Sequence, residues 1–275
     1  MNPGINQWAF PSDMTAAQAI SMAADLGFTS FEVCVGEDGP VRLDSAEPEL
    51  IEIRNHAEQS GVLLHSIGCG LGWSRRLSAA DPSERDHAVS VHERSLEIAH
   101  TLGAKTLLVV PGVVDADSSY ETTLEHSRES IRRLIPTAER LGVSLALENV
   151  WNKFLLSPTE MRDYIDSFGS EAVGAYFDVG NIVLYGFPEQ WLRILDQRVH
   201  AVHMKDFRAA VGNFGGFVML MEGDVNWPAV MDALHAIGYK GPLTAEYGAY
   251  PHSLETMLQH VHSSLTTIIA LGGKA

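Results

Sequence analysis

Four polar residues stand at or near the ends of four successive apolar segments in the second half of the chain. Glu148 follows VSLAL, Asp178 follows VGAYF, His203 follows VHAV, and Glu246 follows PLTA. If these segments are buried parallel strands, their carboxyl ends meet at one rim of a sheet or barrel. Carboxylates that converge there would repel one another unless a cation held them. Since divalent metals accept oxygen-rich ligand sets with a single imidazole, the pattern predicts a metal centre.

Such a centre has a defined chemistry. A metal chelated by a ketose carbonyl oxygen and the adjacent hydroxyl acidifies the C–H bond beside the carbonyl and stabilises the enediolate that forms. One carboxylate removes the proton, and a second carboxylate on the opposite face returns it. Return to the same carbon gives an epimer, and return to the neighbouring carbon gives an aldose/ketose isomer.

The elements that must position these residues alternate regularly along the chain. Apolar runs typical of strands and segments with helical spacing follow one another eight times, and several helices end at a glycine. The expected strands cover residues 5–10, 28–35, 62–70, 105–112, 143–150, 173–181, 199–207 and 241–248. The expected helices cover residues 15–27, 48–61, 82–103, 119–141, 157–169, 187–197, 227–238 and 253–271.

This alternation predicts an α/β fold, a single (β/α)₈ TIM barrel that spans residues 1–275 as one domain. No glycine fingerprint for a dinucleotide follows the first strand, which argues against a Rossmann fold. Ser12 or Asp13 is expected to cap the first helix and Gly27 to end it. The second helix is expected to open on Pro48.

Composition limits the partners. The chain has 275 residues, and its 19 basic and 35 acidic side chains give a net charge of −16, which leaves little basic surface for nucleic acid. No apolar run approaches the roughly 18 residues of a membrane span, and the start does not resemble a signal peptide. We expect a soluble cytoplasmic protein with no membrane partner. A homodimer or homotetramer is compatible with a helix-covered exterior.

Five motifs between Leu145 and Tyr247 carry a resemblance to a known family. They are LALENVWNKFLLSP, YFDVGN, VHMKDF, EGDVNWPAV and LTAEYG. Together they resemble the sugar phosphate isomerase/epimerase group of xylose isomerase-like TIM barrels, which includes ketose 3-epimerases and hydroxypyruvate isomerases. The resemblance implies a small-molecule sugar or sugar phosphate as substrate.

The resemblance also implies roles for particular residues. The metal ligands are expected to be Glu148, Asp178, His203 and Glu246. The metal is expected to be a divalent ion, most commonly Mn²⁺, with Mg²⁺, Co²⁺ and Zn²⁺ as alternatives. In the epimerases of the group two glutamates act as the acid/base pair, and Glu148 and Glu246 take those places here.

Three residues near the ligands are candidates for substrate binding. Ketose 3-epimerases of the tagatose/psicose type carry a histidine three residues after the metal-binding aspartate, whereas this chain has Asn181 and resembles the pentulose-5-phosphate 3-epimerase branch. Arg208 could contact a substrate oxygen, as an arginine does in the family, or could be an exposed loop cation. Lys205 could face the substrate, or could pair with Asp206 or Glu246.

Two further candidates have a structural alternative each. Glu32, inside the second strand, could hydrogen-bond a substrate hydroxyl or could orient His203, whose second ring nitrogen needs a partner when the first binds a metal. Asn152, together with Lys153 beside it, could reach a phosphate or a sugar hydroxyl, or could belong to a loop that caps the next helix at Ser157.

The remaining candidates belong to the walls of the pocket. His65, Trp8 and Trp73 could line it, although a buried tryptophan more often belongs to a core. The long segment over residues 207–227 could form a lid that excludes water, cover the barrel rim, or meet another subunit.

Alternatives to the epimerase/isomerase remain at this stage. A metal-dependent lyase acting on keto-glycosides or sugar acids would use the same proton abstraction and then eliminate a fragment. A non-catalytic sugar-binding barrel would hold metal and sugar without exchanging a proton. DNA-repair endonucleases with several zinc ions share the barrel, but the charge of −16 argues against that class.

Overall fold

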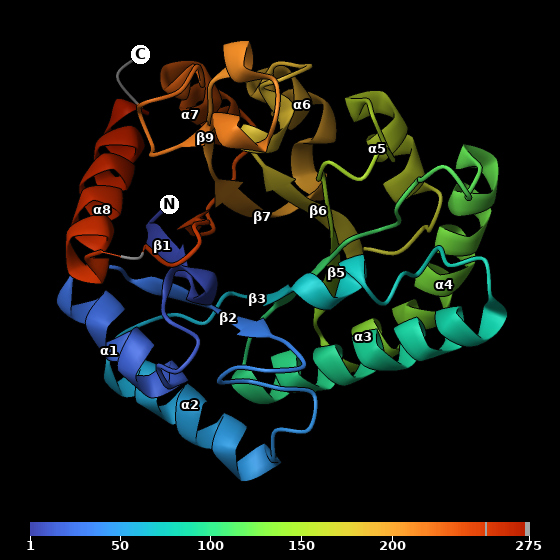
Figure 1. Ribbon diagram of the computed structural model, residues 1–275, viewed down its shortest axis with the longest axis horizontal. Helices are drawn as coiled ribbons and strands as arrows, with labels where there is room; N and C mark the ends of the chain where they lie inside the picture. The colour runs from blue at the N-terminus through green and yellow to red at the C-terminus, as the bar shows by residue number, and fades with distance from the viewer. Residues whose placement is uncertain (251, 273–275) are drawn as a thin grey trace.

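Eight parallel strands form a closed barrel in a computed structural model that describes residues 1–250 and 252–272 (Figure 1). The order around the barrel is β1-β10-β7-β6-β5-β4-β3-β2, so each strand lies beside its neighbours in the chain. The strands are β1 (Pro3–Asn6), β2 (Ser30–Val35), β3 (Ser66–Cys69), β4 (Thr106–Val109), β5 (Ser144–Glu148), β6 (Val173–Asp178), β7 (Val199–Met204) and β10 (Leu243–Ala245). The predicted (β/α)₈ barrel is confirmed.

Helices form a ring outside the barrel, and the last helix, α8, packs beside the first strand, β1 (Figure 1). The helices are α1 (Ala16–Asp25), α2 (Glu47–Gln59), α3 (Pro82–Leu102), α4 (Tyr120–Leu141), α5 (Pro158–Asp166), α6 (Pro188–Leu195), α7 (Trp227–Ala236) and α8 (Leu254–Leu271). Short 3-10 turns cover Gln7–Ala9, Gly70–Trp73, Gly180–Ile182, Asp196–Arg198, Ala209–Val211 and Phe214–Gly216. A small antiparallel pair, β8 (Asp206–Phe207) and β9 (Phe217–Val218), lies in the long loop after β7.

Two expectations for the start of the chain are wrong. The first strand ends at Asn6 and continues as a 3-10 turn, so it does not reach Phe10. The cap of α1 is Thr15, because its hydroxyl accepts from the Gln18 amide while the Gln18 side chain accepts from the Thr15 amide. This reciprocal capping box satisfies two amides at the helix start, which a residue further upstream does not do.

Alternation along the strands decides what faces the barrel interior. In β5, Ala146 and Glu148 share one face, and Ala201 and His203 share one face in β7. Ala146 and Ala201 belong to a small apolar cluster, separate from the larger core, which also contains Leu108, Val110, Val113, Val150 and Tyr176. On these faces, Ala146 and Ala201 therefore belong to an apolar cluster inside the barrel. Glu148 and His203, two residues further along their strands, lie closer to the carboxyl ends.

Among the described residues, no helix combines the length and the apolar character that crossing a bilayer requires.

Candidate metal centre and active site

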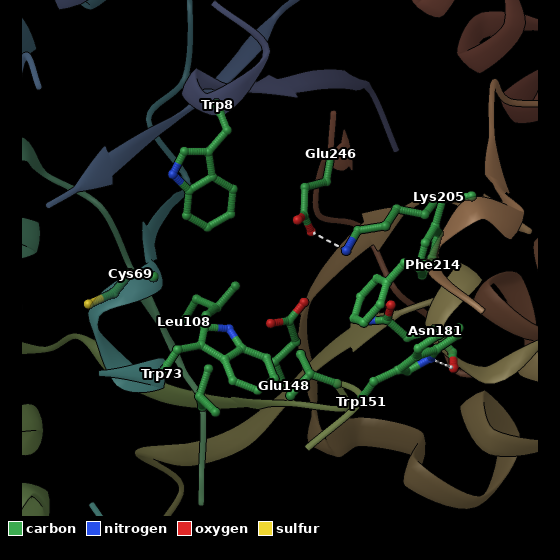
Figure 2. A pocket seen from close by; sticks show the side chains of 14 residues that line it. Trp8, Cys69, Trp73, Leu108, Glu148, Trp151, Asn181, Lys205, Phe214 and Glu246 are labelled. Atoms are coloured by element: carbon green, nitrogen blue, oxygen red, sulfur yellow. Dashed lines mark hydrogen bonds and ion pairs between the residues drawn. The ribbon is translucent and has the colours of Figure 1, made fainter. Parts of the chain in front are cut away.

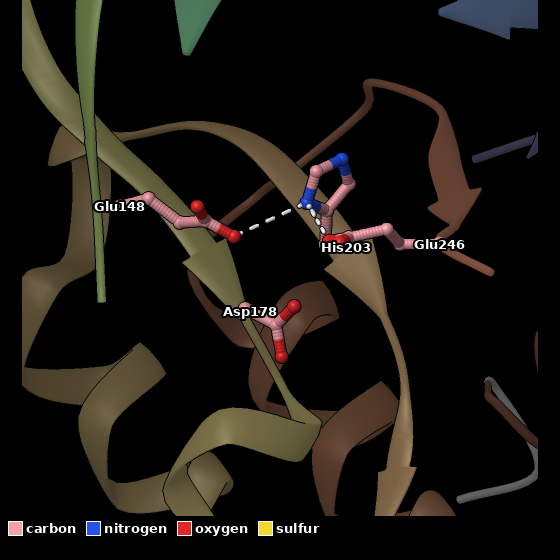
Figure 3. A group of neighbouring side chains, drawn as sticks. All are labelled: Glu148, Asp178, His203 and Glu246. Carbon is pink, nitrogen blue, oxygen red and sulfur yellow. Dashed lines mark hydrogen bonds and ion pairs between the residues drawn. The ribbon is translucent and has the colours of Figure 1, made fainter. Parts of the chain in front are cut away.

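The carboxyl ends of four adjacent strands bring four side chains together. Glu148 and Asp178 are the last residues of β5 and β6, His203 lies in β7 opposite Asp178, and Glu246 follows β10 directly. Each offers one ligand atom, and these atoms all lie within 4.8 Å of one another (Figure 3). Strand register and alternation thus place three carboxylates and one imidazole at a single point of the rim.

The His203 ring has two different environments. Its Nδ1 atom lies 3.3 Å from Glu148 Oε1 and 2.8 Å from Glu246 Oε2, and its Nε2 atom lies 2.9 Å from Glu32 Oε1. The hydrogen bond to the Glu32 oxygen is made when Nε2 carries a proton and donates it. A cation bound between Nδ1 and the two carboxylates would take the place of a proton on Nδ1, which would leave the neutral imidazole as a ligand.

Lys205 partly balances the carboxylates. Its Nζ atom lies 3.1 Å from Asp178 Oδ2. It also lies 2.9 Å from Glu246 Oε2, the contact drawn in Figure 2. These same two oxygens are buried and accept no hydrogen bond of good geometry. Buried oxygens without a hydrogen-bond partner are costly in a protein interior, and carboxylate oxygens are the ligand atoms that divalent metals bind. The residues present therefore fit a metal ion.

The charges at the site also shift its pKa values. Burial raises the pKa of Glu148 to about 7, and the charge of Glu246 adds to the rise. Burial would also raise the pKa of Glu246, but the positive charges of Lys205 and His203 lower it to about 2. Burial raises the pKa of Asp178. A divalent cation among these groups would favour all three ionised carboxylates.

A buried network fixes Glu32 behind His203. The Ser66 hydroxyl donates to Glu32 Oε2 at 2.6 Å, and the Tyr176 hydroxyl donates to the same oxygen. The Tyr176 ring also packs on the His203 imidazole, with ring centroids 4.3 Å apart. Glu32 thus takes the orienting role that the sequence analysis considered, and it does not line the cavity described below.

Replacing Glu32 with glutamine is expected to weaken metal binding by about 10–100-fold, because the imidazole loses the carboxylate that fixes its tautomer and orientation. Metal titration calorimetry measures the change. Glu52→Gln, at an exposed position of α2, is the matched control and should keep the wild-type metal affinity. An unchanged affinity in Glu32→Gln would show that Glu32 does not act through His203.

Two asparagines hold the backbone around Asp178. The Asn149 side chain donates to the Asp178 carbonyl at 2.7 Å and accepts from the Asp178 amide at 2.8 Å. The Asn181 amide donates to Asp178 Oδ1 at 2.8 Å, and its side chain donates to the Asn149 carbonyl at 2.9 Å. Sequence reasoning missed Asn149, although it directly follows Glu148 in the ENV motif.

A cavity of about 350 Å³ is lined by Glu148 and Glu246, two of the four candidate ligands (Figure 2). Glu148, Glu246, Lys205 and Asn181 reach its wall from the rim. The rest of the wall is mainly apolar, with three tryptophans, two phenylalanines and several aliphatic residues; the aromatic members are Trp8, Trp73, Trp151, Phe214 and Phe217. Trp8 and Trp73 thus line the pocket, and Trp73 is 43% exposed at its edge.

A family model described as "Xylose isomerase-like TIM barrel" matches residues 20–266. The chain belongs to this family. A curated relative, L-ribulose-5-phosphate 3-epimerase UlaE of Escherichia coli O1:K1 / APEC, is 24% identical over 246 residues, covering 88% of this chain and 86% of the relative. The resemblance noted in the five sequence motifs is thereby confirmed.

Solved structures agree with the barrel fold. A crystal structure of D-psicose 3-epimerase in the presence of D-fructose has a TM-score of 0.84 at 19% identity and covers 99% of this chain and 100% of that one. The IOLI protein with a binding zinc atom has a TM-score of 0.83 at 17% identity, with 100% of both chains covered. At these identities the likeness shows the fold of this xylose isomerase-like barrel.

Three sequence-predicted substrate contacts lie outside the cavity of this barrel. His65 directly precedes β3, at the opposite end of the strands, where its Nε2 atom lies 3.3 Å from the His200 carbonyl. Asn152 is buried and donates to the Gly112 carbonyl at 2.7 Å, so it shapes the loop after β5. Arg208 is exposed and donates to the Glu222 carbonyl at 2.9 Å.

These positions correct the expectations for the three residues. Tight loops and the register of β3 decide where the side chains point, and neither can be read from sequence spacing. We therefore assign no substrate role to His65, Asn152 or Arg208.

The loop after β7 carries Phe214 and Phe217 to the cavity. Phe214 is 73% exposed, and its ring centroid lies 4.9 Å from that of Trp151. The foot of the loop is tied to the buried carboxylate of Asp206, which accepts from the amides of Phe207, Met221, Gly223 and Val225 and from the Trp227 indole. Sequence reasoning placed Asp206 only as a partner for Lys205, and the structure assigns it to this loop.

Replacing Asp206 with asparagine is expected to destabilise the protein by about 1–3 kcal/mol. The side-chain NH₂ group of asparagine would face backbone N–H groups that now donate to a carboxylate oxygen, and those hydrogen bonds would be lost. Thermal unfolding and limited proteolysis of the loop measure the change. Asp224→Asn is the control in the same loop, because Asp224 is exposed and accepts from the Ala209 amide at 2.8 Å. Equal stability of the two variants would show that Asp206 does not hold the loop.

Proposed function

We propose that this protein is a divalent-metal-dependent sugar epimerase or isomerase that acts on a ketose or ketose phosphate by proton transfer through an enediolate. The observation that carries the proposal is the pair of glutamates that face one another in the cavity (Figure 2), both within reach of Asp178 and His203 (Figure 3). UlaE is named for epimerising a pentulose phosphate, which supports the reaction class.

Glu148, Asp178, His203 and Glu246 would hold the metal, and Mn²⁺ is the ion we propose. The metal supplies positive charge that acidifies a C–H bond beside a sugar carbonyl. Mg²⁺, Co²⁺ or Zn²⁺ could supply the same charge.

Side chains of the protein would remove the proton from the sugar and return it. Glu148 and Glu246 reach the cavity from β5 and β10, so one can remove a proton on one face of the sugar and the other can return it on the opposite face. The Lys205 ammonium stays within 2.9 Å of Glu246 and favours its ionised, proton-accepting form. The aromatic walls exclude water from the reacting carbon.

The proposal also covers the setting of the enzyme. We propose a single domain over residues 1–275, a cytoplasmic location, and a homodimer or homotetramer. The single closed barrel supports one domain, and the helix-covered exterior is compatible with self-association.

The test is NMR in deuterated water with Mn²⁺-loaded protein and a panel of ketoses and ketose phosphates. We expect deuterium to enter next to the carbonyl and the exchange to stop on chelation. The labelled carbon separates a 3-epimerase from an aldose/ketose isomerase, and release of a fragment would indicate a lyase instead. Metal binding without exchange on any sugar would contradict the proposal.

A further inference from the structure

The cavity wall contains a single cation, and its charge is already matched. Among the described residues that line the cavity, Lys205 is the only lysine or arginine. Its ammonium lies 3.1 Å from Asp178, 2.9 Å from Glu246 and 5.5 Å from the centre of the Phe217 ring. No positive charge of the wall is therefore free to meet an anionic group of a substrate.

In the metal-loaded site of the proposed enzyme, no positive charge would be left over either. The three carboxylates of Glu148, Asp178 and Glu246 are offset by the ammonium of Lys205 and by a divalent cation. A phosphate group would bring a further charge of about −1.5 to −2. An unpaired charge in a largely apolar cavity is costly.

A neighbouring cavity of about 530 Å³ shares Trp73 with the first and contains two arginines. Both are paired: Arg75 lies 2.5 Å from Glu37, and Arg76 lies 2.5 Å from Asp115. Each guanidinium thus already has a carboxylate beside it, so its positive charge is offset before any phosphate binds.

The cavity on the other side, about 520 Å³, shares Lys205 and Glu246 with the first and adds the acidic side chains Asp206 and Glu222. The cations Lys153 and Arg208, on the loops after β5 and β7, are exposed and line none of these three cavities. Among residues 1–250 and 252–272, none of the three spaces at the mouth therefore offers a lysine or arginine without a carboxylate partner.

The remainder of the catalytic wall suits an uncharged sugar. Trp8, Trp73 and Trp151 present aromatic surface, and Leu108 presents aliphatic surface (Figure 2). Val110 adds a further aliphatic side chain to the wall. Aromatic faces pack well on the C–H faces of a sugar, and orientation needs only a few polar groups.

We propose that the substrate is an uncharged ketose whose end away from the reacting carbonyl carries hydroxyl groups and no phosphate. This inference rests on the proposed function and narrows its substrate class. It separates the protein from UlaE, which is named for a sugar phosphate, and it goes against the pentulose-5-phosphate branch that the DVGN motif at Asn181 resembles.

The test is titration calorimetry of Mn²⁺-loaded protein with free ketoses and with the same ketoses carrying a terminal phosphate. We expect the free sugars to bind and each phosphate to bind at least about 100-fold more weakly, because its charge stays unpaired. Inorganic phosphate should not compete with the free sugar. Equal or tighter binding of the phosphates, or binding of neither kind of sugar, would overturn the inference.

A variant that adds charge tests the cause. Trp73→Arg places a cation at the exposed edge of the cavity and should improve phosphate binding relative to the free sugar by about 10-fold. Trp73→Gln removes the ring without adding charge and should leave the ratio unchanged. A ratio that does not move in Trp73→Arg would overturn the charge argument.

A second variant tests the two loop cations. Replacing both Lys153 and Arg208 with alanine should leave the ratio of phosphate to free-sugar binding unchanged. A selective loss of phosphate binding would overturn the inference, because it would show that these loops close onto a phosphate.

Failure of the inference and failure of the proposed function give different results. Free ketose that binds without exchanging a proton would refute the epimerase or isomerase and would leave the preference for uncharged sugars standing. Proton exchange that occurs only with the ketose phosphates would support the epimerase or isomerase and would overturn the preference for uncharged sugars.

Discussion

Replacing Glu246 with glutamine is expected to lower turnover by about 10²–10⁴-fold while the protein folds normally. The amide cannot take or return a proton, but it keeps the shape of the side chain and an oxygen that can still bind a metal. The fold should survive because Glu246 follows the end of β10, at the cavity wall and outside the apolar cores. Deuterium exchange in the NMR assay measures the loss, and circular dichroism verifies the fold.

The matched control is Glu222→Gln, another carboxylate at the mouth of the barrel, which is exposed. It should keep wild-type turnover. Metal titration of Glu246→Gln separates the two roles of Glu246, because retained metal with lost turnover identifies proton transfer as the missing function. Activity of Glu246→Gln within 10-fold of wild type would rule out the two-glutamate mechanism.

Removal of the metal with a chelator is expected to abolish exchange and to lower the melting temperature. A metal present at 100 times its dissociation constant stabilises the folded state by about 2.7 kcal/mol. At about 2–4 °C per kcal/mol, its removal lowers Tm by about 5–10 °C. Scanning calorimetry before and after chelation measures the shift, and re-addition of Mn²⁺ should restore both Tm and exchange.

Metal binding should also release protons. Burial raises the pKa of Glu148 to about 7. Burial lowers the pKa of His203, but the charges of Glu32 and Glu246 raise it well above its usual value. The metal binds the deprotonated groups, so its affinity falls as the pH drops below 7. Calorimetry in buffers of different ionisation enthalpy counts the protons, and an affinity that is constant from pH 8 to pH 5 would contradict this linkage.

The architecture could be predicted from the sequence because the signals for strands and helices are local. Each strand of a parallel barrel is buried on both faces and is therefore an apolar run, and each helix ends where a glycine or a capping residue permits. Gly103 and Gly142 follow α3 and α4 with φ of 77° and 64°, which explains why the helix ends could be predicted so closely.

The four candidate ligands could also be predicted from the sequence. In a parallel barrel the carboxyl end of every strand lies at the same rim, so Glu148, Asp178, His203 and Glu246 are brought together by topology alone. No side-chain detail was needed for this step.

Only the tertiary structure decided what surrounds these ligands. The ties of Asp206 to its loop, the packing of Phe214 on Trp151, and the place of Arg208 outside the cavity depend on loop paths that no local pattern specifies. The Lys205 ammonium contacts two carboxylates from different parts of the barrel, Asp178 and Glu246, because closure of the barrel sets the distances between these side chains. Contacts between residues far apart in the chain determine which side chains line the cavity and which charges are paired there. Local periodicity in the sequence determines the barrel and the residues at its rim.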